Sequence, residues 1–202
     1  MGQSNVAAGA TLGSNHNGRM NDCEMWAGRG FWPGLCSSVR FNSKFASFCL
    51  LAKSDFPYEL NIRLPFSLVN NNGAENCLEI IPAYWWLYNM YALFRNFFKF
   101  RERSSGTDSM KGVELSFMAP DTTEEVLEGL KLIEERRLKA KSIETEFRSI
   151  NIELPAEGIE GSDRIVRVLR VDKARSAYRE MLLFYCGSVI FEFVSASKGN
   201  LD

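Results

Sequence analysis

Two consecutive hexads open the chain: Val6-Ala7-Ala8-Gly9-Ala10-Thr11 and Leu12-Gly13-Ser14-Asn15-His16-Asn17. Each begins with an aliphatic residue followed by Ala or Gly, a pattern typical of a parallel β-helix. The aliphatic side chain points inward there, and the small residue permits a tight corner. A coil of this kind takes roughly 18 residues and needs about three stacked units for stability. Because only two hexads are present, we expect residue 1 to lie inside a longer solenoid, so that the chain is a fragment.

From residue 23 to residue 69 the hexad period is lost, but the residues remain typical of β-structure. Segments 45–51 and 59–64 are expected to be strands, the second because apolar and polar residues alternate in it. Turns are expected at 31–34 and 55–58, each around a proline. A loop is expected at 70–73, since Asn and Gly tolerate positive φ.

An aromatic-rich segment follows, IIPAYWWLYNMYALFRNFFKF at 80–100. Its length would suffice for a membrane span, but Asn89, Arg95 and Lys99 interrupt it, and a central Arg is costly in lipid. We expect a helix over 83–98 that starts after Pro82 and buries Trp86 in the core. A polar linker is expected over 101–108.

The C-terminal region has the strongest helix signals. Thr122 and Glu125 fit a capping box, and an apolar face follows, which predicts a helix over 123–147. Strands are expected at 113–117 and 164–171, and a second helix at 174–185, with Ala174, Ala177, Tyr178, Met181 and Leu182 facing inward. The expected divisions are 1–70 for the β-helix end and irregular β segment, 71–108 for the aromatic helix and linker, and 109–202 for the α-helical region.

Composition excludes several classes of protein. The net charge is −1, with 24 Lys and Arg against 25 Asp and Glu, so an overall basic surface for nucleic acid is absent. Five cysteines without a C-x-x-C pair, and a single histidine, predict structural thiols and no metal site. The N-terminal residues lack the basic and apolar regions of a secretory signal, which favours a cytoplasmic location. No nucleic-acid or membrane partner is expected.

Charge is segregated in the second half: residues 121–160 carry net −5 and residues 164–179 carry net +5. One interpretation is that the two segments pack together and neutralise each other. The other is an anion site around Arg164, Arg167 and Arg170. In a strand, Arg167 would face away from the other two, which weakens a single clustered site.

His16 is the best candidate catalytic residue, because a proton transfer by histidine near neutral pH must use this single imidazole. Asn15, Asn17 and Arg19 surround it with hydrogen-bonding groups. Further candidates for a ligand-binding groove lie in the nearby β segment: Arg29, Trp32, Lys53, Asp55 and Tyr58. A structural or merely exposed histidine is the alternative. The glycines at 28, 30 and 34 fail the spacing of a phosphate-binding loop.

Several long strings are similar to one family: GATLGSNHNGRMND, AGRGFWPGLCSS, KFASFCLLAKSDFPYELNIRLPFSLVNNN, PAYWWLYNMYALFRN and FMAPDTTEEV. Together with segment 164–185 they resemble the C-terminal half of domain of unknown function 4954, a bacterial family found mainly in Bacteroidetes. The resemblance implies a trimeric LpxA-like left-handed β-helix with helical additions. It implies no catalytic residue and no cofactor.

The expected fold class is therefore mixed β and α: terminal coils of a left-handed parallel β-helix, an irregular β segment and an α-helical C-terminal region. The leading functional hypothesis is part of a transferase-like protein, acyl- or nucleotidyltransferase-like, acting on a sugar, nucleotide-sugar or acyl donor. The alternative is a non-catalytic structural or oligomerisation module that caps a β-helix. Fold analogy alone does not assign a reaction.

Overall fold

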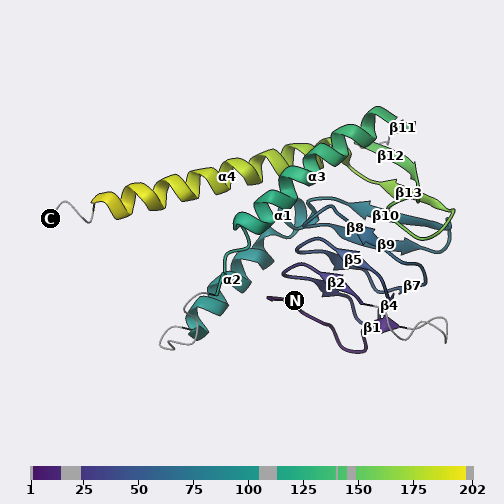
Figure 1. Cartoon of the computed structure of the whole chain (residues 1–202), viewed down its shortest axis with the longest axis horizontal. Helices are drawn as coiled ribbons and strands as arrows, with labels where there is room; N and C mark the ends of the chain where they lie inside the picture. Colours follow the sequence, from purple (N-terminus) through teal and green to yellow (C-terminus); the bar gives the residue numbers. More distant parts are fainter. Residues whose placement is uncertain (1, 15–23, 105–112, 140, 145–148, 199–202) are drawn as a thin grey trace.

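The computed structural model describes residues 2–14, 24–104, 113–139, 141–144 and 149–198 (Figure 1). Strands β1 to β10 come first, followed by helices α1, α2 and α3, strands β11 to β13 and the long helix α4. The chain is mixed β and α, which confirms the general fold class. Figure 1 shows α4 projecting far beyond the stacked strands.

Parallel strands form three sheets at the start of the chain. The first holds β1 (Thr11–Ser14), β4 (Ser38–Arg40) and β7 (Asp55–Phe56), and the second holds β2 (Trp26–Ala27), β5 (Lys44–Phe45) and β8 (Asn61–Ile62). The third begins with β3 (Trp32–Pro33), β6 (Leu50–Leu51) and β9 (Leu68–Asn72). Trp32 pairs with Leu50 and Leu50 with Leu68, so one circuit of the three sheets takes 18 residues. We call residues 24–72 the coil.

The hexad period continues through the coil, so the prediction that it is lost after residue 23 is wrong. Four residues spaced by six have a left-handed backbone: Gly30, Cys36, Asn42 and Phe48. Two buried stripes keep the same spacing, with Val39, Phe45 and Leu51 in one and Ser37, Ser43 and Cys49 in the other. The small residues are Ser and Cys at the fifth position of each hexad, whereas the prediction searched for Ala or Gly at the second.

Short strands also explain the errors made within the coil. The predicted strand at 45–51 is a corner at Phe48 between β5 and β6, and only β8 lies in the predicted strand at 59–64. The predicted turns at 31–34 and 55–58 contain β3 and β7. Strands of two or three residues between corners are too short to show an alternation pattern.

The third sheet continues beyond the coil and joins the two halves of the chain. Strand β9 is antiparallel to β10 (Cys77–Ile81), and β10 is parallel to β13 (Ile165–Val168). Strands β12 (Ile150–Pro155) and β11 (Lys141–Glu144) complete the edge. The predicted loop at 70–73 is wrong for its first three residues, which belong to β9. Asn70 and Asn72 donate hydrogen bonds to the Glu79 carboxylate across the hairpin.

The aromatic segment forms two helices, α1 (Tyr84–Tyr88) and α2 (Met90–Ser104), separated at Asn89. The predicted single helix is thus divided, and it extends into the predicted linker. Trp85, at 2% exposure, is the buried tryptophan. Trp86 is only partly buried and donates its indole N–H to Glu180, so the prediction that Trp86 occupies the core is wrong.

Helix α3 (Pro120–Lys139) begins before the predicted start and ends before the predicted end. The predicted capping box is wrong, because the Glu125 carboxylate accepts a hydrogen bond from the Ser47 N–H of the coil. Thr122 instead accepts the N–H of Ala119 at the helix start. The strand predicted at 113–117 is absent: none of these residues lies in a strand.

Helix α4 (Val171–Lys198) is longer than the predicted helix at both ends. Its predicted inward residues Ala174, Ala177, Tyr178 and Met181 are buried, and Leu182 is partly buried. Buried residues of the coil, α1, α2, α3, the C-terminal strands and α4 form one continuous hydrophobic core.

Candidate functional site

The predicted catalytic cluster of Asn15, His16, Asn17 and Arg19 lies outside the described residues. The other predicted site residues are described and lie in different places on the coil. Lys53 and Asp55 are exposed.

Arg29 links the coil to α3. Its guanidinium donates to both carboxylate oxygens of Asp121 at 2.7 and 2.9 Å and to the Ser116 carbonyl at 2.7 Å. It also donates to the Gln3 side-chain oxygen at 3.3 Å. Burial of Asp121 opposes ionisation, but the hydrogen bonds from Arg29 and the backbone prevail and lower its pKa. Arg29 is thus a tie between elements.

Tyr58 belongs to a different cluster. The Arg164 guanidinium lies 5.2 Å from the centroid of its ring and forms an ion pair with Glu160 at 2.5 Å. The side chains of this pair are 7% and 1% exposed. Hydrogen bonding to Glu160 raises the pKa of Arg164. A buried pair of this kind is a structural element.

The three arginines of the predicted anion site each have other partners. Arg167 contacts Glu75 at 2.6 Å and Glu153 at 3.1 Å, and Arg170 donates to the Tyr88 hydroxyl. Arg175 and Arg179 both contact Glu134 on α3 at 3.2 Å. The interpretation that the acidic and basic segments neutralise each other is confirmed, and the clustered anion site is wrong.

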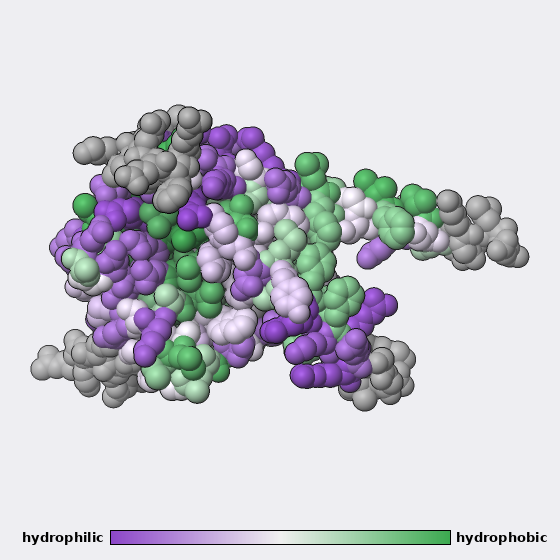
Figure 2. All heavy atoms as spheres, turned by 180° about the vertical axis from the view of Figure 1, so that it is seen from behind, coloured by the Kyte–Doolittle hydropathy of each residue, from purple (hydrophilic) through white to green (hydrophobic). Residues whose placement is uncertain are grey.

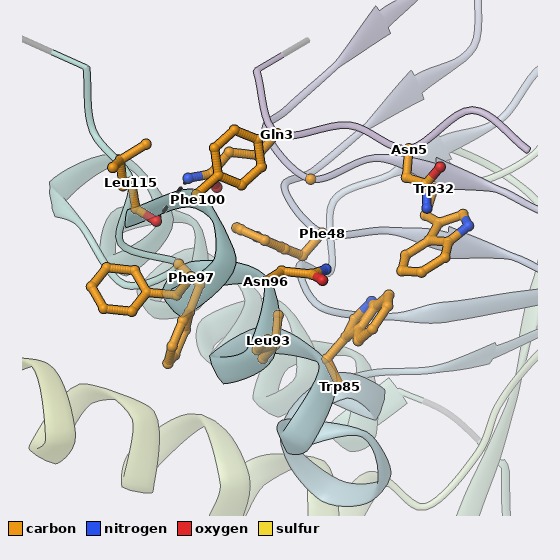
Figure 3. A pocket seen from close by; sticks show the side chains of 12 residues that line it. Gln3, Asn5, Trp32, Phe48, Trp85, Leu93, Asn96, Phe97, Phe100 and Leu115 are labelled. Atoms are coloured by element: carbon orange, nitrogen blue, oxygen red, sulfur yellow. Dashed lines mark hydrogen bonds between the residues drawn. The ribbon is translucent and has the colours of Figure 1, made fainter. Parts of the chain in front are cut away.

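A pocket, here called the indole pocket, lies between the coil and the aromatic helices (Figure 3). It has a volume of about 500 Å³ including its open mouth, within the usual range for small-molecule sites. The coil and the segment before it supply Gln3, Asn5, Gly30, Trp32 and Phe48; α1 and α2 supply Trp85, Leu93, Asn96, Phe97 and Phe100; Leu115 and Phe117 complete the lining.

Trp85 gives this pocket its chemical character. The side chain is 2% exposed, yet its indole N–H has no hydrogen-bond partner within the described structure. A buried donor left unpaired costs about 1–3 kcal/mol. Its ring stacks on Trp32 with 5.3 Å between centroids, and Figure 3 shows both indoles along one wall. An acceptor on a ligand would satisfy this N–H.

Three amide side chains complete the polar lining. Gln3 is engaged at both ends, since it donates to the Leu115 carbonyl at 2.8 Å and accepts from Arg29. Within the described part of the chain, the amides of Asn5 and Asn96 have no side-chain partner. None of the twelve lining residues is charged. The pocket therefore suits a neutral group with hydrogen-bonding atoms.

The close approach of Gly30 to Phe48 helps shape the pocket. Gly30 has a φ of +67°, and a Cβ at this position would lie 2.3 Å from the Phe48 ring. Only glycine allows the coil to turn here with Phe48 facing the pocket. Of the predicted site residues, Trp32 alone lines the pocket. Trp85 and Asn96 were missed, although a polar Asn in an aromatic helix was a usable signal.

The cysteines are partly as predicted. Cys49 and Cys77 are buried free thiols, and burial raises the pKa of both. Cys36 and Cys186 are exposed, so the prediction of structural thiols is wrong for them. Among the described residues, no group of three or more His, Cys, Asp or Glu side chains could hold a metal ion.

The outer half of α4, residues 183–198, carries apolar side chains with little cover (Figure 2). Leu183, Phe191 and Phe193 are each 73% exposed and Ile190 is 63% exposed. Within the described residues, α4 is the one helix long and apolar enough to cross a membrane, by length and composition only. The segment at 80–100 does not meet that test.

The chain is 46% identical over 205 residues to an uncharacterized protein of Treponema pallidum (strain Nichols). The match covers 95% of this chain but only 28% of that protein, so the chain spans little more than a quarter of its relative. No family model matches the chain, and no solved structure matches it.

Proposed function

We propose that the chain is part of a transferase-like protein that acts on a sugar, nucleotide-sugar or acyl donor. The indole pocket would hold the neutral part of that donor. The observation that carries this proposal is the unpartnered indole N–H of Trp85 in a pocket that lies beside two unpaired amide side chains. His16 remains the proposed catalytic residue, with Asn15, Asn17 and Arg19 beside it in the sequence.

The same proposal assigns the coil to the left-handed β-helix class and the chain to domain of unknown function 4954. Two features support a left-handed β-helix: the circuit of 18 residues, equal to three hexads, and the recurring positive φ at every sixth residue. Enzymes of the related superfamily include acyltransferases of sugars and sugar nucleotides, which raises the prior for transfer chemistry.

Calorimetry with nucleotide-sugars and acyl-CoA thioesters tests the function, using both this chain and the full-length protein. We expect binding of one donor class, weakened by Trp85→Phe. Trp26→Phe is the control, because Trp26 is 64% exposed and lies outside the pocket. If neither donor class binds the full-length protein at millimolar concentration, the transferase proposal is wrong.

One observation favours the alternative of an oligomerisation module, with a second copy of this chain as the partner. At about 150–250 Å² for each aromatic side chain, the seven exposed apolar residues of the outer half of α4 present on the order of 700 Å². Stable interfaces bury about 800 Å² per partner. These residues lie all around the helix, so a single neighbour cannot cover them. A closed trimer gives each helix two neighbours.

The length of the outer half favours a protein partner over a membrane. At about 1.5 Å per residue it rises roughly 24 Å, short of the hydrocarbon core of about 30 Å. Analytical ultracentrifugation should show a trimer that the double variant Phe191→Ser/Phe193→Ser converts to a monomer. Leu127→Ser, at an exposed site on α3, should leave the trimer intact. A monomeric wild-type chain, whether or not it binds lipid vesicles, would contradict this alternative.

A further inference from the structure

The lining of the indole pocket combines broad apolar faces with few polar groups. Six of its twelve residues are aromatic: Trp32, Phe48, Trp85, Phe97, Phe100 and Phe117. In Figure 3 the two indoles stand along one side, with Phe97 and Phe100 on the other and Phe48 and Asn96 between them. The unpaired polar groups are the Trp85 N–H and the amides of Asn5 and Asn96.

The absence of charge in this lining limits the occupant. None of the twelve lining residues carries a charge that could balance a buried phosphate or carboxylate. Arg29 lies near the margin, with its guanidinium 5.8 Å from the Phe48 ring centroid, but Asp121, Gln3 and Ser116 already occupy its donors. The occupant is therefore a neutral group.

Three neutral parts of the proposed donors can be compared. A hexose carries hydroxyl groups around its whole rim, and many would face Phe side chains unpaired, which is costly. A simple acyl chain would fill the apolar space but bring at most one carbonyl to three unpaired polar groups. A nucleobase has two apolar faces and confines its polar atoms to its edge. Stacking of a base on an aromatic side chain contributes about 1–3 kcal/mol.

We propose that the indole pocket is a nucleobase site, in which the base stacks among the aromatic side chains while its edge meets Trp85 and the two Asn amides. This rests on the proposed function and names which part of the donor the pocket recognises. The Trp85 N–H donates to a carbonyl oxygen or ring nitrogen of the base. An Asn side chain offers both a donor and an acceptor, as base edges require.

The same geometry has a consequence for phosphates. Because no charged side chain lines the pocket, the base supplies the recognition and the phosphates add little. A nucleoside and its monophosphate should bind with affinities that agree within a few-fold, and added salt should change them little. A site built on phosphate contacts would show the opposite behaviour.

The test measures the four common ribonucleosides and their monophosphates by calorimetry and by quenching of tryptophan fluorescence. Methyl glucoside and a short N-alkyl acetamide represent the other two chemistries. We expect at least one nucleoside to bind, and the two neutral probes to fail to compete with it. Asn96→Ala and Trp85→Phe should each weaken nucleoside binding at least about tenfold, whereas Lys99→Ala and Trp26→Phe should leave it unchanged. Asn96 is exposed on α2, so its variant is expected to fold even if the Trp85 variant does not.

The outcomes separate this inference from the proposed function. If an intact donor binds but nucleosides do not, or if Asn96→Ala leaves nucleoside affinity unchanged in a folded protein, the nucleobase site is wrong and the transferase proposal stands. If methyl glucoside or the acetamide displaces the nucleoside with equal affinity, the nucleobase site is also wrong. Nucleoside binding without binding of any intact donor would keep the site and overturn the transferase proposal.

Discussion

The buried pair of Glu160 and Arg164 and the indole pocket treat polar groups in opposite ways. Around Glu160 every charged group is answered: Arg164 donates twice to its carboxylate, Ser162 donates to it at 2.7 Å, and Asn71 accepts from Arg164 at 2.7 Å. In the pocket the Trp85 N–H has no partner within the described structure. A fully paired network stabilises the fold, whereas a rigid, unpaired polar group in a hollow is available to a ligand.

The first prediction breaks the paired side of this comparison. Glu160→Ala leaves the nearly buried Arg164 guanidinium without its carboxylate, which should cost about 3–5 kcal/mol of unfolding free energy. Chemical denaturation measures it. Glu157→Ala, at an exposed site three residues away, serves as the control and should change little. A loss below about 1 kcal/mol for Glu160→Ala would show that the pair behaves as a surface salt bridge.

A smaller effect is expected where one neutral hydrogen bond is removed. The hydroxyl of Tyr178, fully buried on α4, donates to the Pro65 carbonyl of the coil at 2.7 Å. Tyr178→Phe leaves that carbonyl unpaired and should lower stability by about 1–2 kcal/mol. Tyr91→Phe is the matched control, because Tyr91 is 75% exposed. Equal melting temperatures for both variants would show that the hydroxyl contributes nothing.

The same contrast explains what the sequence could predict. Inward residues of α4 such as Ala174 and Tyr178 follow from helical periodicity, which is a local signal. The short coil strands do not, because their register depends on neighbours 18 residues away, as for Trp32 and Leu50. The pocket combines Gln3 with Asn96 and Phe117, and no local pattern encodes that distance in sequence. Trp32 was found because it lies in a recognisable β segment.

Glu125 sharpens the comparison through pH. Burial of its carboxyl raises its pKa, even though the Ser47 N–H donates to it. The folded protein therefore binds this proton more readily than the unfolded chain does. Stability from this group is fully present below about pH 4.3, the ordinary glutamate value, and is lost as the pH rises through the folded pKa.

Glu125→Gln removes this dependence while keeping an oxygen that can accept from Ser47. Its stability relative to wild type should increase as the pH rises above the ordinary glutamate value, as measured by urea denaturation between acidic and neutral pH. Glu124→Gln is the control, since Glu124 is exposed on the same helix. Stability curves for Glu125→Gln and wild type that stay parallel over this range would contradict the raised pKa.

The smallest expected effect on folding comes from the unpaired side, at Asn96. Its amide has no partner among the described residues, and it lies exposed on α2, so Asn96→Ala removes no hydrogen bond. Ala has a higher helix propensity than Asn, by several tenths of a kcal/mol. The unfolding free energy should thus stay within about 0.5 kcal/mol of wild type or rise slightly.

Ligand binding should respond in the opposite sense. A nucleoside that raises the melting temperature of wild type should raise that of Asn96→Ala much less, because ligand stabilisation depends on affinity. Lys99→Ala, one turn further along α2, should retain the full shift. A destabilised Asn96→Ala protein would mean that the amide belongs to a network like that of Glu160. In that case the distinction between a paired structural cluster and an unpaired binding pocket would fail at this residue.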